Sequence, residues 1–168
     1  HIVLVAQQVK EEALHFDLLG NKDYVVLMHG SHPLSGREGV WIRELAGEKF
    51  ICDASRLNRR NLTRICKEQG FEPNVGYEVE SSELIYQLLE GNAGIAFMPI
   101  SQFAKIRSLH PDSPIHCLTI LDDIPQAVIG VVYHKNYVFT QAAQLFVDFL
   151  RQWLAQEENV IQELGYPV

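Results

Sequence analysis

Several features that define specialised protein classes are scarce or missing in this sequence. Its 168 residues include three cysteines, Cys52, Cys66 and Cys117, which form no C-x-x-C pair and are odd in number. That usage argues against a disulfide framework and is typical of a reducing cytoplasm. No apolar run approaches membrane-spanning length, and no signal peptide opens the chain. The formal net charge of −7 argues against this chain gripping a nucleic-acid backbone by itself. Composition therefore predicts a cytoplasmic domain with no membrane partner.

What remains is ordinary for a soluble globular protein. Hydrophobic residues make up 47% of the chain and charged residues 21%. The length suffices for one domain with a real core or for two small lobes.

The most informative stretch runs from Ser82 to Pro99. Its first half carries apolar residues at helical spacing, namely Leu84, Ile85, Leu88 and Leu89. Ser81 or Ser82 is expected to cap this helix, and Gly91 to supply a left-handed residue at its end. Gly94–Met98 is then predicted to be a short buried strand. A helix that feeds directly into a buried strand is typical of an open α/β sheet.

The rest of the chain alternates in the same way. Strands are predicted over 1–6, 14–19, 24–29, 49–53, 74–79, 115–120 and 127–134, with a turn at 20–23 and a loop over 30–39. Helices are predicted over 41–45, 56–69, 100–106, from Thr140 onward, and again near 160–164. The apolar stripe of the long helix after Thr140 is expected to face the core; its members are Ala142, Ala143, Phe146, Phe149, Leu150 and Trp153.

Four motifs occur in an order that resembles one known family. Tyr24–His29 followed by Ser31–Ser35 (S-H-P-L-S) is similar to its strand and H-P-L turn, and Leu45–Ile51 to its D-L-x-G-x-P-F-I segment. Cys66–Pro73 is similar to its C-x-x-x-G-F-x-P helix end, and Gly94–Pro99 to its G-I-A strand. Together they resemble the effector-binding domain of LysR-type transcriptional regulators.

The resemblance implies a type 2 periplasmic-binding-protein-like α/β fold with two lobes and a ligand cleft. Residues 9–132 would form lobe II, and residues 1–8 with 133–168 an incomplete lobe I. The crossovers would lie near Ala6–Val9 and Val132–His134. The DNA-binding domain and the first two strand–helix units would be absent from this chain.

The helix starts after two strands are the first candidate binding site. Ser55 with Arg56, and Ser81 with Ser82, each follow a strand and open a helix. Free N–H groups at such starts favour carboxylates and other oxygen-rich groups. The plainer interpretation is that each serine only caps its helix and that Arg56 faces water. The family resemblance favours effector contacts at these positions.

Four further residues complete the candidate effector site: Gln7, Gly94, Ile95 and Tyr133. Gln7 is equally compatible with a solvated linker, and Tyr133 with packing in the core. Glu78, Glu80 and Glu83 would repel a bare anion near Ser81, which favours a zwitterionic or neutral polar ligand. A carboxylate metabolite is the remaining alternative.

Other chemistries find little support in the sequence. His29 and His32 have no third ligand nearby, so we predict no metal site and no cofactor. No nucleophile elbow accompanies Cys52, so we predict no catalytic residue. Cys66 lies near a peroxide-sensing position of some family members, but Leu57 occupies the other, so Cys66 is expected to be a core residue.

The sequence therefore predicts a non-enzymatic effector-sensing domain that forms homodimers or homotetramers and reaches DNA only through a winged helix-turn-helix outside this chain. A solute-binding protein of the same fold and an enzyme on a two-lobed scaffold remain the alternatives, because fold alone does not decide function.

Overall fold

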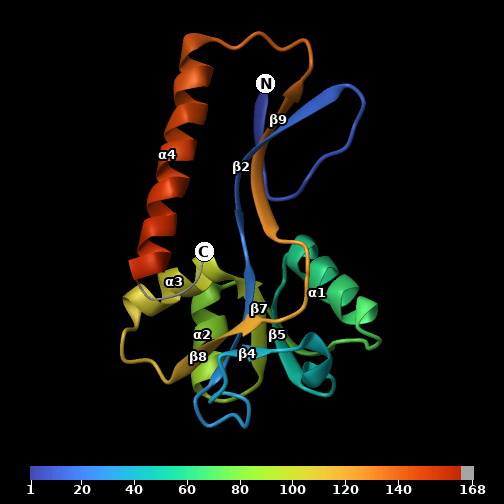
Figure 1. The fold of residues 1–168 in the computed structure, drawn as a ribbon, viewed down its shortest axis with the longest axis vertical. Coiled ribbons are helices and arrows are strands. Elements are labelled where there is room, and N and C mark those ends of the chain that lie inside the picture. The colour runs from blue at the N-terminus through green and yellow to red at the C-terminus, as the bar shows by residue number, and fades with distance from the viewer. Residues whose placement is uncertain (164–168) are drawn as a thin grey trace. The chain divides into compact units, whose positions relative to one another are not determined.

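The chain forms two compact units, shown in Figure 1. The computed structural model describes the backbone of residues 1–163 and, within it, all side chains except those of Arg56, Glu158 and Val160. The first unit comprises His1–Asp23 and the residues from Gln126 on, and the second comprises Tyr24–Pro125. Each unit has its own sheet.

The boundaries between the units differ from those expected at 8/9 and 132/133. Strand β2 (Leu14–Lys22) pairs with β9 (Ala127–His134) along its whole length, from Leu14 opposite His134 to Lys22 opposite Ala127. Hydrogen bonding to β9 therefore keeps residues 9–23 in the first unit, and it makes a strand of most of the turn predicted at 20–23.

The first unit is a three-stranded antiparallel sheet with one long helix. Strand β1 (Ile2–Val5) pairs with the other side of β9, which gives the order β1-β9-β2. Helix α4 (Gln141–Glu163) packs against β2. The hydroxyl oxygen of Thr140 accepts a hydrogen bond from the N–H of Ala143 at 3.2 Å, which confirms Thr140 as the predicted cap.

The face of α4 that packs on the sheet is not the predicted one. Val147, Leu154 and Ile161 are buried, whereas Phe146, Phe149 and Trp153 are 50%, 61% and 47% exposed. Apolar residues occupy more than one side of this helix, so their spacing alone did not determine which side faces the sheet. The helix predicted near 160–164 is the continuation of α4, and its expected stop at Gly165 and Pro167 lies outside the described residues.

The second unit is built on a six-stranded mixed sheet with the order β4-β8-β3-β7-β5-β6. Its elements are β3 (Tyr24–His29), β4 (Gly39–Val40), a 3-10 helix (Ile42–Leu45), β5 (Lys49–Asp53), α1 (Arg56–Glu68), β6 (Asn74–Val79), α2 (Ser82–Glu90), β7 (Ile95–Pro99), α3 (Ile100–Leu109) and β8 (Ile115–Ile120). Strand β5 lies parallel to both β6 and β7, which confirms the parallel arrangement predicted for residues 49–98.

Alternation along β5 divides the core of this unit between two faces. Phe50 and Cys52 pack in one buried cluster with Ile65 of α1. Ile51 and Asp53 point to the opposite side of the sheet, because successive side chains alternate along a strand. Helices α2 and α3 are in contact with each other (Figure 1). Both border a cavity that Asp53 also lines.

One detail of the predicted helix end is wrong. Gly91 ends α2 with an ordinary φ of −75°, and the left-handed residue is Asn92, with φ of 52°. Asparagine tolerates this conformation better than most side chains, so the turn does not need glycine there.

Candidate functional site

Two helices of the second unit begin at the same edge of the sheet. Strands β5 and β6 are parallel neighbours, and α1 and α2 follow their respective carboxyl ends. Ligands of open α/β sheets bind at such edges, where helix N-termini offer unpaired N–H groups.

The start of α1 is closed by its own chain. The Ser55 hydroxyl accepts a hydrogen bond from the N–H of Asn58 at 3.3 Å, and the carboxylate of Asp53 accepts one from the N–H of Ser55 at 2.7 Å. Two polar groups are thereby committed to the turn. The side chain of Arg56, the residue predicted beside Ser55, lies outside the described residues.

The start of α2 is built differently. Ser81 occupies the N-cap position with extended backbone, but its side chain makes no capping hydrogen bond. Glu83 stands in the first turn. The first N–H groups of a helix have no partner inside the helix, and the Ser81 side chain does not supply one to α2.

A cavity of about 260 Å³ adjoins this uncapped start. Its lining comes from the ends of β5 and β6, the first turn of α2 and one side of α3: Asp53, Glu80, Ser82, Glu83, Gln102, Lys105, Ile106, Leu109 and His110. All nine residues belong to the second unit. Among the predicted site residues whose side chains the structure describes, Ser82 is the one that lines this cavity.

Contacts within the second unit hold the wall of the cavity in place. The His110 ring stacks on Tyr86 with 4.0 Å between centroids, and its Nε2 lies 3.5 Å from a carboxylate oxygen of Glu83. Arg107 donates hydrogen bonds to the carbonyl oxygens of Pro111, Ser113 and Ile115. The loop that carries His110 is thus anchored to α3 by a guanidinium whose planar fork suits several acceptors.

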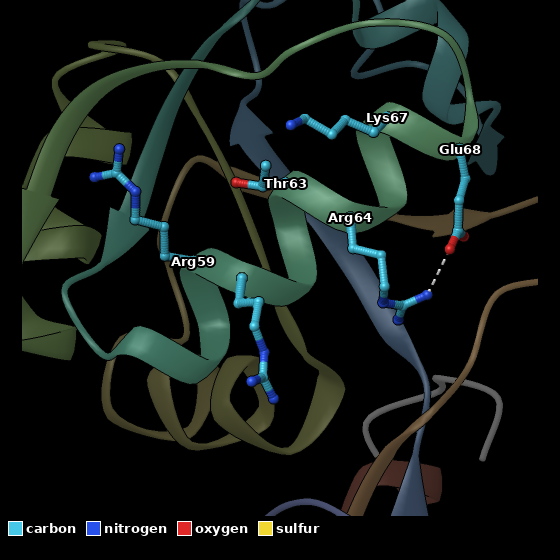
Figure 2. A pocket seen from close by; sticks show the side chains of 6 residues that line it. Arg59, Thr63, Arg64, Lys67 and Glu68 are labelled. Atoms are coloured by element: carbon cyan, nitrogen blue, oxygen red, sulfur yellow. Dashed lines mark hydrogen bonds and ion pairs between the residues drawn. The ribbon is translucent and has the colours of Figure 1, made fainter.

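A larger, shallow groove of about 640 Å³ follows the exposed side of α1, as Figure 2 shows. Its lining is mostly cationic, with Arg59, Arg60, Arg64 and Lys67, as the sequence predicted for the solvent side of this helix. These charges are largely balanced within the chain. Arg59 pairs with Glu78, Arg64 with Glu68 at 2.9 Å, and Lys67 with Glu72 at 2.9 Å. Balanced exposed pairs give this groove little net attraction for an anion.

Gln7 and Tyr133 both belong to the first unit, and in sequence they are several residues from its observed boundaries after Asp23 and before Gln126. Gln7 is exposed in the loop between β1 and β2. Tyr133 lies near the end of β9 opposite Ile2, where its ring packs edge-on against Phe139 at 4.8 Å. Packing, the plainer interpretation of Tyr133, is therefore what the structure shows.

Gly94 and Ile95 serve the interior of the sheet. A Cβ at Gly94 would collide with the carbonyl oxygen of Lys49, so glycine allows β7 to approach β5 closely. Ile95 is completely buried in the cluster with α1. The Ile95 side chain is therefore sealed from the surface, and the predicted effector contact at this position stays a prediction.

Sequence reasoning missed the contribution of α3 altogether. Gln102, Lys105 and His110 line the cavity, but this helix has no glycine-rich turn or cap motif to draw attention to it. A usable signal was the mixture of Gln, Lys and His with apolar residues on a short helix directly after a buried strand.

His29 and His32 form hydrogen bonds within one turn, and the three cysteines are buried or half-buried. His32 lies 3.2 Å from a carboxylate oxygen of Glu48, and among the described residues no group of three or more His, Cys, Asp or Glu side chains is placed to hold a metal. Burial raises the pKa of the Cys66 and Cys117 thiols to about 12 and also raises that of Cys52. Thiols of this kind are poor nucleophiles. Cys66 is 1% exposed, as expected of a core residue.

No helix in the described part of the chain is long and apolar enough to cross a membrane.

Comparison with known proteins identifies the family to which this two-unit α/β fold belongs. The LysR substrate binding domain family matches residues 1–155, and the chain belongs to that family. Its fold is that of the type 2 periplasmic-binding-protein-like domains found in LysR effector-binding structures, as predicted.

Individual relatives agree. The Bacillus subtilis (strain 168) protein YwbI, named as an uncharacterized HTH-type transcriptional regulator, is 24% identical over 156 residues, which cover 91% of this chain and 50% of that protein. The chain spans about half the length of the curated relatives it matches.

Solved structures share the fold. A Corynebacterium glutamicum OxyR C206 mutant superposes with a TM-score of 0.78 at 16% identity, over 99% of this chain and 52% of that one. The BenM effector-binding domain, solved with its effector benzoate, gives 0.75 at 22% identity over 94% and 70% of the two chains. The family and its curated relatives are regulators rather than enzymes, as the sequence predicted.

Proposed function

We propose that this chain is the effector-sensing part of a LysR-type transcriptional regulator. A small metabolite binds it and changes how an attached winged helix-turn-helix engages DNA. The observation that carries this proposal is the family match over residues 1–155. The cavity beside the open start of α2 supplies a place for such a ligand. DNA is reached only through the winged helix-turn-helix, in the cytoplasm, by a homodimer or homotetramer.

The proposed polar contacts are the serines at the helix starts. Ser82 lines the cavity and Ser81 leaves the start of α2 uncapped, which supports both positions. Ser55 is exposed but already bonded to Asn58, so it is the weaker of the candidates. Gln7 stays a prediction.

The ligand is proposed to be a carboxylate or zwitterionic metabolite. BenM, a structural relative, was solved with benzoate, a carboxylate. Helix N-termini favour such groups. The ligand can control DNA binding only to the extent that its affinity differs between two arrangements of the protein.

The test uses the full-length regulator and DNA from upstream of its own reading frame. A metabolite screen by thermal shift identifies binders, because a ligand of the native state raises its melting temperature. Each binder is then added to an electrophoretic mobility or footprinting assay. We expect at least one binder to change the affinity or the footprint. A protein that never binds that DNA, or binders that leave both unchanged, would contradict the proposal and favour a solute-binding role.

A further inference from the structure

We infer that the cavity between α2 and α3 binds a small zwitterion of the α-amino-acid type. The inference rests on the proposed function and names the ligand class of the site. Three properties of the cavity support it: the distribution of charge, the donors at the start of α2, and the size and polarity of the remaining lining.

Carboxylates dominate the charge of the cavity. Asp53, Glu80 and Glu83 contribute three, against the single ammonium of Lys105. One oxygen of Asp53 accepts the N–H of Ser55, and Glu83 lies near His110, whereas no ion pair of Glu80 is among those of the described residues. A bare carboxylic acid would enter against this excess of negative charge, while a ligand with an ammonium group gains from it.

The same cavity also offers donors to a carboxylate. The Ser82 hydroxyl and the first N–H groups of α2 lie at an uncapped helix start, where the helix dipole favours negative charge. Lys105 lines the cavity from α3, and none of the described ion pairs uses it. A lone amine would leave these donors without an acceptor, so neither half of the zwitterion alone matches the cavity.

Part of the lining is apolar. Ile106 is buried and Leu109 is 66% exposed, and together they form the hydrophobic part of the lining. A volume of about 260 Å³ is sufficient for a ligand of amino-acid size. Gln102 and the Tyr86–His110 stack add polar and aromatic edges that can select the side chain.

The first experiment screens the twenty proteinogenic L-amino acids by thermal shift on the full-length protein. The amino acid with the largest shift is then compared, by calorimetry, with its deaminated acid and its decarboxylated amine; for leucine these are 4-methylpentanoate and 3-methylbutylamine. We expect each analogue to bind at least about tenfold more weakly, since each loses a charge-assisted interaction. A deaminated acid that binds as tightly as its amino acid, or no shift with any amino acid, overturns the inference.

Matched variants locate the site. Glu80→Gln and Lys105→Met should each weaken the amino acid at least about fivefold while the melting temperature of the free protein stays close to that of the wild type. Glu72→Gln, at an exposed carboxylate outside the cavity, and Lys10→Met, in the first unit, are the controls and should change affinity less than twofold. Equal losses in the controls and the cavity variants would place the ligand elsewhere and overturn the assignment.

The outcomes separate this inference from the proposed function. If an acid without an amino group binds and alters DNA binding, the regulator proposal stands and the zwitterion inference falls. If an amino acid binds in the cavity but never affects DNA binding, the zwitterion inference stands and the regulator proposal falls.

Discussion

The two helix starts that follow β5 and β6 look alike in sequence but differ in structure. At α1 the serine hydroxyl and a neighbouring aspartate are both used by the turn. At α2 the serine leaves the helix start open, and acidic residues and α3 form a cavity around it. A serine thus caps the start of α1 with its hydroxyl, whereas a serine at the start of α2 leaves that helix uncapped. The two helix starts differ in whether a second helix completes a cavity beside them, as α3 does at the start of α2.

The largest effects are expected from the anchors that fix each helix to the sheet. Ile65→Ala on the buried side of α1 and Leu89→Ala on the buried side of α2 should each lower the free energy of unfolding by about 2–5 kcal/mol, because removing a buried side chain leaves a cavity. Urea unfolding followed by circular dichroism measures this. Ligand affinity at 25 °C should survive only in Ile65→Ala, since α2 carries the site; loss in Ile65→Ala alone would reverse the comparison.

The Cys66 thiol, on the buried side of α1, offers a pH-dependent test of how firmly α1 is packed against the sheet. Burial raises the pKa of Cys66 to about 12 from an ordinary 9.0. At pH 8 its thiolate population should therefore be about a thousandfold lower than in the unfolded chain. The folded-state pKa is raised, so the associated stability is intact below pH 9 and is lost as the pH rises from about 9 toward 12.

Two measurements examine this prediction. Labelling with a thiol reagent should be slow in buffer and fast in urea, and the urea midpoint should fall between pH 8 and pH 10. A Cys66→Ala variant, compared at the same two pH values, should show a smaller fall. Rapid labelling of Cys66 in the native protein would mean that the α1 side opens readily.

Loss of the Arg107 guanidinium should loosen the loop that carries His110 and so affect the cavity beside α2 more than the region around α1. Arg107→Met removes the donor to three carbonyl oxygens of the loop before β8 and should cost about 2 kcal/mol. Amide exchange should then increase around His110, and binding in the cavity should weaken. Arg107→Lys should restore part of the stability. Unchanged exchange near His110 would show that the loop is held by other contacts.

The smallest expected effect separates the two serines directly. Ser55→Ala removes a capping bond and should cost about 1 kcal/mol, while Ser81→Ala, which removes none, should cost only a few tenths. Thermal and urea unfolding of the two variants decide between them. Equal costs would show that Ser81 caps α2 after all.

Much of the fold could be predicted from sequence because buried strands bounded by turns are locally encoded. β3, β5, β6, β8 and β9 occupy the predicted residues. Strand pairing is not local, and the antiparallel partnership of β2 with β9 moved both boundaries between the units. The packed face of α4 depended on which of several apolar sides met the sheet.

The candidate site was harder to predict than the fold. Ser82 was found because capping residues at strand–helix junctions are visible in sequence. Lys105 and His110 were not, because they reach the cavity only through the packing of α3 against α2. Ile95 shows another limit of the sequence, since a motif shared with a family marked a residue whose side chain the sheet buries.

The most direct test is a ¹H–¹⁵N NMR titration of the protein with the amino acid that raises its melting temperature most. The account predicts saturable shifts at the amides of Ser82, Glu83 and Lys105, with Asn58 in α1 unchanged. Shifts centred on the start of α1 with a silent α2, or no saturable shifts at all, would contradict it.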